Sequence, residues 1–213
     1  RITVIYPGVE PHFTPNGDDA ALQAILARYG IREPYLLSVG TLQPRKNFVR
    51  LIHAYHALRQ ERHIPHQLVI AGGRGWLFDE IHATIASLRL EEQVRLVGFV
   101  ADEHLPALYR GAALFAFPSL YEGFGIPVLE AMACGAPVVT SAASSLPEAA
   151  GEAALLVDPN DVDALTEALW RVLDDSALRN ALRARGFEQV KRFSWAESAR
   201  RLRAVYYATA KGG

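Results

Sequence analysis

Short, nearly continuous apolar runs recur along this chain, and a segment with helical spacing of apolar residues follows each of them. Most of the runs end in Gly, Pro or Ser and show no alternation of apolar and polar residues. Such runs are typical of strands that are buried on both faces of a parallel sheet. The pattern predicts six strands, at residues 35–40, 67–72, 94–98, 113–118, 137–141 and 154–158.

Apolar residues at helical spacing predict helices between and after these strands. The last helix begins at 194-SWAE-197, a capping box with Ser194 at the N-cap and Glu197 at N3. Regular alternation of strands and helices indicates an α/β fold, a Rossmann-like, doubly wound parallel sheet of about six strands. Ligands of such sheets bind at the carboxyl ends of the strands, so the loops there form the candidate site. The clearest predicted helices cover residues 47–60, 161–173, 177–191 and 194–209.

The first residues have the pattern of a further strand, followed by a linker. Residues 1–11 begin as an apolar run, and Pro7, Pro11 and Pro15 then interrupt any regular structure. The chain starts at Arg1 within this apolar pattern and has no signal peptide. We therefore expect it to be part of a longer protein whose N-terminal portion lies outside this sequence.

The composition excludes several classes of function. The 213 residues carry a formal net charge of −1, which gives neither an electrostatic footprint for nucleic acid nor a polybasic membrane patch. No apolar run is long enough to span a bilayer. The single cysteine, Cys134, is expected in the core, and one thiol excludes an internal disulfide and a cysteine-based zinc site. We expect a cytoplasmic protein and leave open a peripheral attachment to the inner face of the membrane.

The first candidate loop is 40-GTLQPRKN-47, which follows a predicted strand and leads into a helix. Gly40 permits close approach of the backbone to a ligand, and Asn47 is a plausible helix N-cap. Arg45 offers a planar fork of donors that suits phosphate oxygens, and Lys46 offers a compact point charge. Two solvated surface charges are the alternative interpretation of this pair.

The second candidate loop lies in 118-PSLYEGFGIPVLEAMACG-135. Gly123 and Gly125 predict a loop whose amide groups can face a ligand, and Pro127 suits the first turn of the helix that follows. A helix N-terminus preceded by small residues binds phosphate through its free N–H groups and the helix dipole. Glu122 on this loop has the alternative interpretation of a solvated carboxylate.

Glu130 is harder to explain as a surface residue, because its neighbours in the sequence are suited to the core. It lies between Leu129 and Ala131 in an otherwise apolar stretch. A carboxylate without partners costs free energy in such a place, so partners are expected. Two vicinal hydroxyl groups of a ribose would supply two donors for its two oxygens.

Other chemical motifs are missing from the sequence. The stretch 72-GGRGW-76 is Gly-rich but is not GxGxxG, and no GxxxxGK[ST] occurs. His53 and His56 lie three positions apart on a predicted helix, but no third metal ligand is suitably placed, so surface or boundary positions are favoured. No serine has GxSxG around it, and Ser144 and Ser145 are interpreted as a turn into a short helix.

Together these loops resemble glycosyltransferase family 4, the glycosyl transferases group 1. The family is marked by two glutamates with seven residues between them, here 122-EGFGIPVLE-130 within PSLYEGFGIPVLEAMACGAPVV. The stretches 37-LSVGTLQPRKN-47 and 144-SSLPEAAGEAALLVDPND-161 also match the family. The resemblance implies the GT-B fold, of which residues 1–213 would be the C-terminal, nucleotide-sugar-binding half. Residues 1–16 would then be an interdomain linker, and the helix at 194–209 would cross to the N-terminal half.

The resemblance also implies roles for individual residues. Arg45 and Lys46 would bind the donor diphosphate, Glu122 would contact hydroxyls of the donor sugar, and Glu130 would hold the ribose. The donor would further be bound by Gly40, by the backbone of Phe124, Gly125 and Ile126, and by 98-GFVAD-102, where Val100 and Asp102 would lie beside the base.

The implied reaction transfers a sugar from a nucleotide diphosphate to an acceptor hydroxyl with retention at the anomeric carbon, without a metal or another cofactor. The motif wording favours a mannosyltransferase that uses GDP-mannose in bacterial surface polysaccharide synthesis. UDP- and other NDP-sugars stay open as donors, as do a nucleotide-sugar epimerase and a non-catalytic nucleotide-binding module. The sugar or lipid-linked acceptor would be bound by the N-terminal domain.

Overall fold

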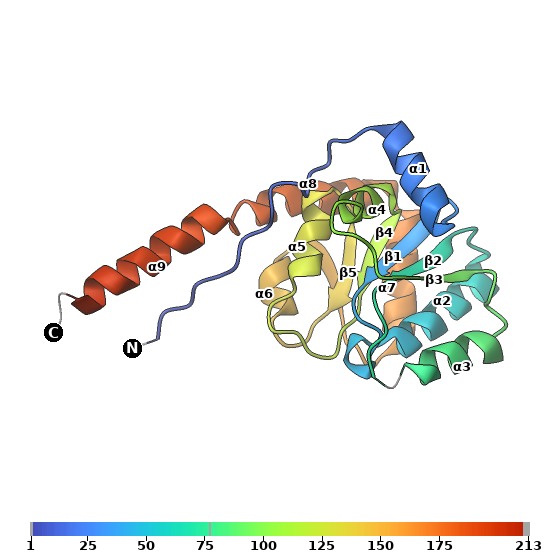
Figure 1. Cartoon of the computed structure of the whole chain (residues 1–213). Coiled ribbons are helices and arrows are strands. Elements are labelled where there is room, and N and C mark those ends of the chain that lie inside the picture. Colours follow the sequence, from blue (N-terminus) through green and yellow to red (C-terminus); the bar gives the residue numbers. More distant parts are fainter. Residues whose placement is uncertain (1, 77, 211–213) are drawn as a thin grey trace.

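Six parallel strands form the centre of the fold in a computed structural model that describes residues 2–76 and 78–210. The sheet order is β3-β2-β1-β4-β5-β6, and every neighbouring pair is parallel. The six predicted strands and the doubly wound α/β class are therefore confirmed (Figure 1). The strands are β1 (Tyr35–Val39), β2 (Gln67–Ala71), β3 (Val94–Gly98), β4 (Leu114–Phe117), β5 (Val138–Ser141) and β6 (Ala154–Val157).

The sheet is buried on both faces, as its continuous apolar runs predict. Successive side chains of a strand point to opposite faces. In β1, accordingly, Leu36 and Leu37 belong to two different clusters of buried side chains, one on each side of the sheet. The inner strands are almost fully buried, whereas the edge strands β3 and β6 contain exposed positions.

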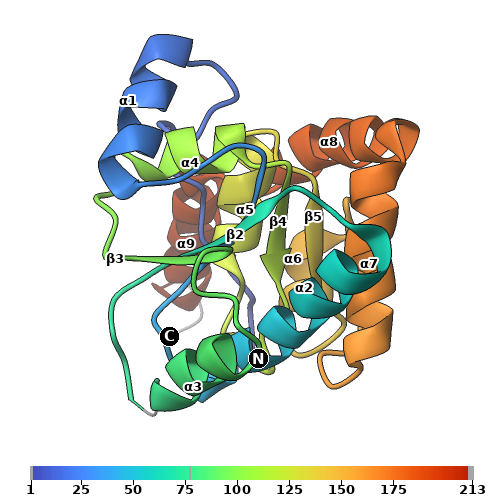
Figure 2. The ribbon, with the colours of Figure 1, turned by 90° about the vertical axis from the view of Figure 1, so that its right-hand side faces the viewer.

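Helices cover both faces of the sheet (Figure 1, Figure 2). One cluster of buried residues is shared with α1 (Asp19–Tyr29), α4 (Leu105–Gly111), α5 (Ile126–Ala133) and α6 (Leu146–Ala150). The other is shared with α2 (Phe48–Arg62), α3 (Asp79–Ser87) and α7 (Val162–Asp174), and α8 (Ser176–Val190) contacts both α5 and α7. The helices predicted over 47–60, 161–173 and 177–191 are confirmed within one or two residues.

The strand predicted at the N-terminus is wrong. Residues 2–10 pair with no strand of the sheet, and Ile2 is 93% exposed. This segment instead runs beside the start of α9 (Trp195–Ala210), where the Val9 N–H donates to the Phe193 carbonyl at 3.2 Å. Of its apolar side chains, Tyr6 and Val9 are partly buried and pack against the cluster on one face of the sheet, whereas Ile2 and Val4 are exposed.

The last helix, α9, is present as predicted but buries none of its residues, and it projects from the body of the molecule (Figure 1). The Ser194 hydroxyl accepts the Glu197 N–H at 3.2 Å, which confirms the N-cap. The Glu197 carboxylate binds Arg200 and Arg201 instead of closing the capping box. No helix in the described part of the chain combines the length and the apolar content that crossing a bilayer requires.

The first three strands are added in one direction across the sheet, from β1 to β3, and the last three in the opposite direction, from β4 to β6. The parallel strands β1 and β4 lie side by side in the centre, where this order reverses. The loop after β1 and the loop after β4 therefore emerge next to each other and turn towards opposite faces. This is the topological switch point at which open α/β sheets bind ligands. It brings together the two loops that the sequence singles out, although more than 70 residues separate them.

Candidate functional site

The loop after β1 is packed tightly at its glycine. The Gly40 N–H donates to the Ala71 carbonyl at 2.8 Å, and a side chain on Gly72 would collide with the Gly40 carbonyl. A Cβ added to Gly40 itself would lie 3.0 Å from the Cε of Lys46. Glycine at position 40 therefore leaves the space through which Lys46 reaches the edge of the sheet.

Lys46 and Arg45 converge on one carboxylate from the neighbouring loop. They lie on a short 3-10 turn, η1 (Pro44–Lys46). The Lys46 Nζ donates to Glu122 Oε1 at 2.7 Å, and an Arg45 guanidinium nitrogen lies 2.8 Å from Glu122 Oε2. The same Arg45 nitrogen donates to the Tyr121 carbonyl at 2.5 Å. The structure thus brings together Arg45, Lys46 and Glu122, the three residues to which the resemblance assigns contacts with the diphosphate and the sugar of the donor.

This cluster is largely screened from solvent. The side chains of Lys46 and Glu122 are each 10% exposed, whereas that of Arg45 is 36% exposed. Burial by itself would raise the pKa of the Glu122 carboxyl, but the hydrogen bonds from Lys46 and Arg45 outweigh it and lower that pKa. Glu122 is consequently an ionised, paired carboxylate, and its interpretation as a solvated loop residue is wrong.

Two serines fix the backbone of Glu122. The Glu122 N–H donates to the Ser144 hydroxyl at 2.9 Å, and the Ser145 hydroxyl donates to the Glu122 carbonyl at 3.0 Å. Ser144 and Ser145 lead into α6, as their sequence predicts. Their contacts with Glu122 are not predicted, because serines at a helix start ordinarily satisfy local backbone groups.

Asn47 occupies the N-cap position of α2, as predicted, but its side chain does not cap the helix. Its backbone is left-handed, with φ 62°, and its side chain does not bond to the helix N-terminus. Its amide nitrogen donates instead to the carbonyls of Pro118 and Pro159, at 3.0 and 2.7 Å. Asn47 therefore ties the loop after β1 to the loop after β4 and to the loop between β6 and α7.

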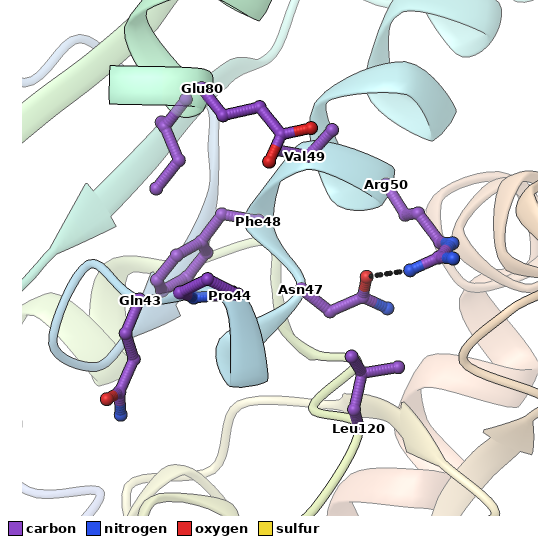
Figure 3. A pocket seen from close by; sticks show the side chains of 9 residues that line it. Gln43, Pro44, Asn47, Phe48, Val49, Arg50, Glu80 and Leu120 are labelled. Atoms are coloured by element: carbon purple, nitrogen blue, oxygen red, sulfur yellow. Dashed lines mark hydrogen bonds between the residues drawn. The ribbon is translucent and has the colours of Figure 1, made fainter. Parts of the chain in front are cut away.

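A pocket of about 320 Å³ lies beside this junction (Figure 3). In it the side-chain oxygen of Asn47 accepts a hydrogen bond from Arg50 at 2.9 Å. None of the predicted site residues lines it. The predicted site lies at the carboxyl ends of β1 and β4, outside this pocket. The lining residues are Gln43, Pro44, Asn47, Phe48, Val49, Arg50, Glu80, Ile81 and Leu120.

The loop after β4 ends at a helix start whose N–H groups carry no side-chain cap. Gly125 precedes α5 with φ 111°, and a Cβ there would lie 2.7 Å from Leu146 Cδ2. Pro127 occupies the first turn, as predicted. The ring of Phe124 stacks on Tyr6 at a centroid distance of 5.5 Å. The side chain of Phe124 is thus used in packing, and only its backbone is available to a ligand.

Glu130 has a protein partner that the sequence does not reveal. The Tyr109 hydroxyl, from α4, donates to Glu130 Oε2 at 2.9 Å. Burial raises the pKa of Glu130 to about 7, the Tyr109 hydrogen bond opposes this rise, and the nearby Asp102 carboxylate adds to it. Val100 is buried, so only its backbone can meet a ligand at the loop after β3. From the sequence, Tyr109 would be interpreted as an aromatic residue of the core. Only its contact with Glu130 in the structure shows that it belongs to the candidate site.

The remaining candidates are structural. Cys134 is buried, as predicted, and burial raises the pKa of its thiol to about 12. His53 is exposed and His56 half-buried, in keeping with the surface and boundary positions that the sequence favours. Among residues 2–76 and 78–210, no group of three or more His, Cys, Asp or Glu side chains is arranged to hold a metal ion.

The comparison with protein families decides the assignment of this chain. The family model described as "Glycosyl transferases group 1" matches residues 25–189, which include both loops of the site. The chain belongs to this family. The O-antigen chain mannosyltransferase B of Escherichia coli is 44% identical over 172 residues, which are 80% of this chain and 45% of that protein.

Solved structures with low sequence identity share the fold. The C-terminal domain of a glycosyl transferase group 1 family protein (LpcC) from Francisella tularensis aligns with TM-score 0.71 and 24% identity, over 84% of this chain and 94% of that one. Alr3699/HepE from Anabaena, in complex with UDP-glucose, aligns with TM-score 0.85 and 22% identity, over 97% of this chain and 57% of that one. The chain spans about half or less of the length of the curated relatives that it matches.

Proposed function

We propose that this chain is the nucleotide-sugar-binding domain of a retaining glycosyltransferase. The observation that carries the proposal is the convergence of Arg45, Lys46 and Glu122, from loops after two adjacent strands, at the switch point of the sheet. Two cations face one carboxylate, so the cluster keeps a net positive charge that favours an anionic diphosphate.

Arg45 and Lys46 would act on the leaving group of the transfer. As the bond between the sugar and the diphosphate breaks, negative charge grows on the phosphate oxygens. Guanidinium and ammonium groups fixed beside that charge stabilise the transition state more than the ground state. Glu122, released from the cations by the phosphates, would then accept hydrogen bonds from hydroxyls of the donor sugar.

The rest of the donor would lie along α5 and the loop after β3. The uncapped N–H groups at Phe124, Gly125 and Ile126 suit a phosphate at a helix N-terminus. Glu130 lies four residues farther along the same helix and would accept the ribose hydroxyls. The base would lie near Val100, beside the carboxyl end of β3.

The donor that we favour is GDP-mannose. Support for mannose comes from the similar Escherichia coli protein, whose name describes it as an O-antigen chain mannosyltransferase. A UDP-sugar is the second candidate, because the structurally similar Alr3699/HepE was solved with UDP-glucose. The acceptor, a sugar or a lipid-linked sugar, would be bound by an N-terminal domain at the cytoplasmic face of the membrane.

Thermal denaturation with GDP, UDP and ADP tests the proposal. A ligand at about 100 times its Kd stabilises the folded state by about 2.7 kcal/mol. In a domain of this size that corresponds to a rise of roughly 5–10 °C in Tm. We expect the rise with GDP, or with UDP if the second candidate is correct, and a much smaller one with ADP.

Two lysine variants make the test specific. Lys46→Gln removes a buried ammonium group from the cluster and should weaken nucleotide binding about tenfold or more. Lys191→Gln removes an exposed ammonium group from a pair with Glu188 and should leave binding unchanged. If millimolar GDP, UDP and ADP all leave the Tm of the folded chain unchanged, the proposal is wrong.

A further inference from the structure

Tyr109 and Glu130 form a contact between two helices at the edge of the candidate site. Tyr109 belongs to α4, and its hydroxyl donates to Oε2 of Glu130, in α5, at 2.9 Å. Glu130 is half-buried and Tyr109 is fully buried. The Glu130 carboxylate is therefore bound by Tyr109 on one side, and the half-buried side chain is still partly accessible to a ligand.

The ring of Tyr109 is held on two sides by aromatic side chains. Phe115, from β4, lies edge-on at a centroid distance of 5.2 Å, and Phe13, from the N-terminal segment, lies edge-on at 6.0 Å. Edge-to-face pairs of this kind restrict the orientation of a buried ring. The Tyr109 hydroxyl consequently occupies a fixed point, and so does the carboxylate oxygen that it binds.

The second carboxylate oxygen of Glu130, Oε1, can accept hydrogen bonds from a ligand. No described residue donates a hydrogen bond to Oε1, whereas Oε2 accepts the Tyr109 hydroxyl. A carboxylate oxygen has two lone-pair sites, so Oε1 can accept two donors and Oε2 one more. Burial disfavours the ionised form of this carboxyl, and the donated hydrogen bond counteracts that effect.

We propose that Tyr109 is a positioning residue that orients the Glu130 carboxylate and keeps Oε1 directed at the vicinal hydroxyls of the donor ribose. This inference rests on the proposed function, in which Glu130 binds the ribose. It adds a residue outside both loops of the site, and it makes discrimination of the ribose depend on a hydroxyl that never touches the nucleotide.

Calorimetric titration with GDP and with 2′,3′-dideoxy-GDP tests the inference, with UDP and 2′,3′-dideoxy-UDP as a parallel pair. Above its pKa of about 7 the Glu130 carboxylate is a charged acceptor, so at about pH 8 the wild-type chain should bind the ribonucleotide about tenfold or more tightly than its dideoxy form. Tyr109→Phe keeps the ring between Phe13 and Phe115 but removes the hydroxyl. It should abolish most of this difference and leave the affinity for the dideoxy nucleotide unchanged.

Tyr35→Phe is the matched control. The Tyr35 hydroxyl is also buried and also bonds to α4, donating to the Leu108 carbonyl at 2.7 Å. A general loss of packing or of hydrogen bonding in α4 would affect both variants alike. The inference requires that only Tyr109→Phe lose the discrimination, and that adding Tyr109→Phe to Glu130→Gln cause no further loss.

The outcomes separate the inference from the proposed function. If neither GDP nor UDP binds the wild-type chain, both are overturned. If the nucleotide binds and Tyr109→Phe discriminates as the wild type does, only the role of Tyr109 is overturned. If the wild type itself binds the ribo and dideoxy forms equally, Glu130 does not hold the ribose and the inference is overturned, while nucleotide binding at the cation pair stands.

Discussion

Replacing Glu122 by glutamine should destabilise the ligand-free chain and strengthen its binding of a free nucleoside diphosphate. The variant keeps the shape of the side chain but removes the negative charge between Lys46 and Arg45. Removing one partner of a buried ion pair costs about 3–5 kcal/mol, because the other charge is left uncompensated. Arg45 is 36% exposed and screened by water, so the lower end, about 3 kcal/mol, applies here.

That loss converts into a drop in Tm of roughly 6–12 °C for a domain of this size. A diphosphate can replace the missing negative charge, so GDP should raise the Tm of Glu122→Gln by more than it raises the Tm of the wild type. The pKa of the Glu122 carboxyl is lowered in the folded state, so its stabilising effect is present above its unfolded pKa near 4.5. The two melting temperatures should therefore converge as the pH falls through the folded-state pKa.

Differential scanning fluorimetry with and without GDP measures the first two effects at neutral pH, and a pH series that extends well below the unfolded pKa near 4.5 measures the third. Glu188→Gln is the control, because Glu188 forms an exposed pair with Lys191 at 2.6 Å and 72% of its side chain is accessible. That variant should keep the wild-type Tm within about 2 °C. A Glu122→Gln chain that melts like the wild type, or that GDP stabilises less, would refute the reasoning about the cluster.

Three further substitutions test other parts of the account. Glu130→Gln should raise the free energy of unfolding more at about pH 8 than at pH 4.5, by up to about 3 kcal/mol, or roughly 6–12 °C in Tm. The reason is that burial raises the pKa of Glu130 from 4.5 to about 7, so the wild-type protein loses stability as the pH rises between those values. A difference in Tm that does not change with pH contradicts this. Gly125→Ala should lower the Tm and weaken GDP binding, because φ is 111° and the new Cβ meets Leu146 at 2.7 Å; calorimetry with wild-type affinity would speak against a ligand at this helix start. Asn47→Ala should lower the Tm by roughly 2–8 °C, because the carbonyl of Pro118 loses a buried donor. If chemical denaturation finds the same free energy of unfolding as in the wild type, the hydrogen bond between Asn47 and Pro118 does not stabilise the fold.

The sheet could be predicted from the sequence because burial on both faces makes each strand a continuous apolar run. The same reasoning wrongly predicts a strand at the N-terminus, because residues 2–10 have a similar apolar pattern and yet lie outside the sheet. Helix α1 was not predicted, although its limits are encoded locally. Asp18 accepts hydrogen bonds from the first N–H groups, and Gly30 ends the helix with φ 65°.

The site was predictable where its chemistry lies in contiguous motifs and not where it depends on contacts between distant segments. Arg45, Lys46 and Glu122 stand in two loops whose residue types indicate anion and hydroxyl binding. The direct pairing of the two cations with the carboxylate could not be predicted, because it follows only from the strand order, which places β1 beside β4. Tyr109 could not be singled out, because an aromatic residue with helical spacing is far more often part of the core.

Calorimetry with GDP and GMP shows whether Arg45 and Lys46 bind the diphosphate of a nucleotide. UDP and UMP serve as the parallel pair. The diphosphate should bind the wild-type chain about tenfold or more tightly than the monophosphate, and Lys46→Gln should remove most of that difference. Equal affinity for the diphosphate and the monophosphate in the wild-type chain, or a difference that survives Lys46→Gln unchanged, would contradict this role of the two cations.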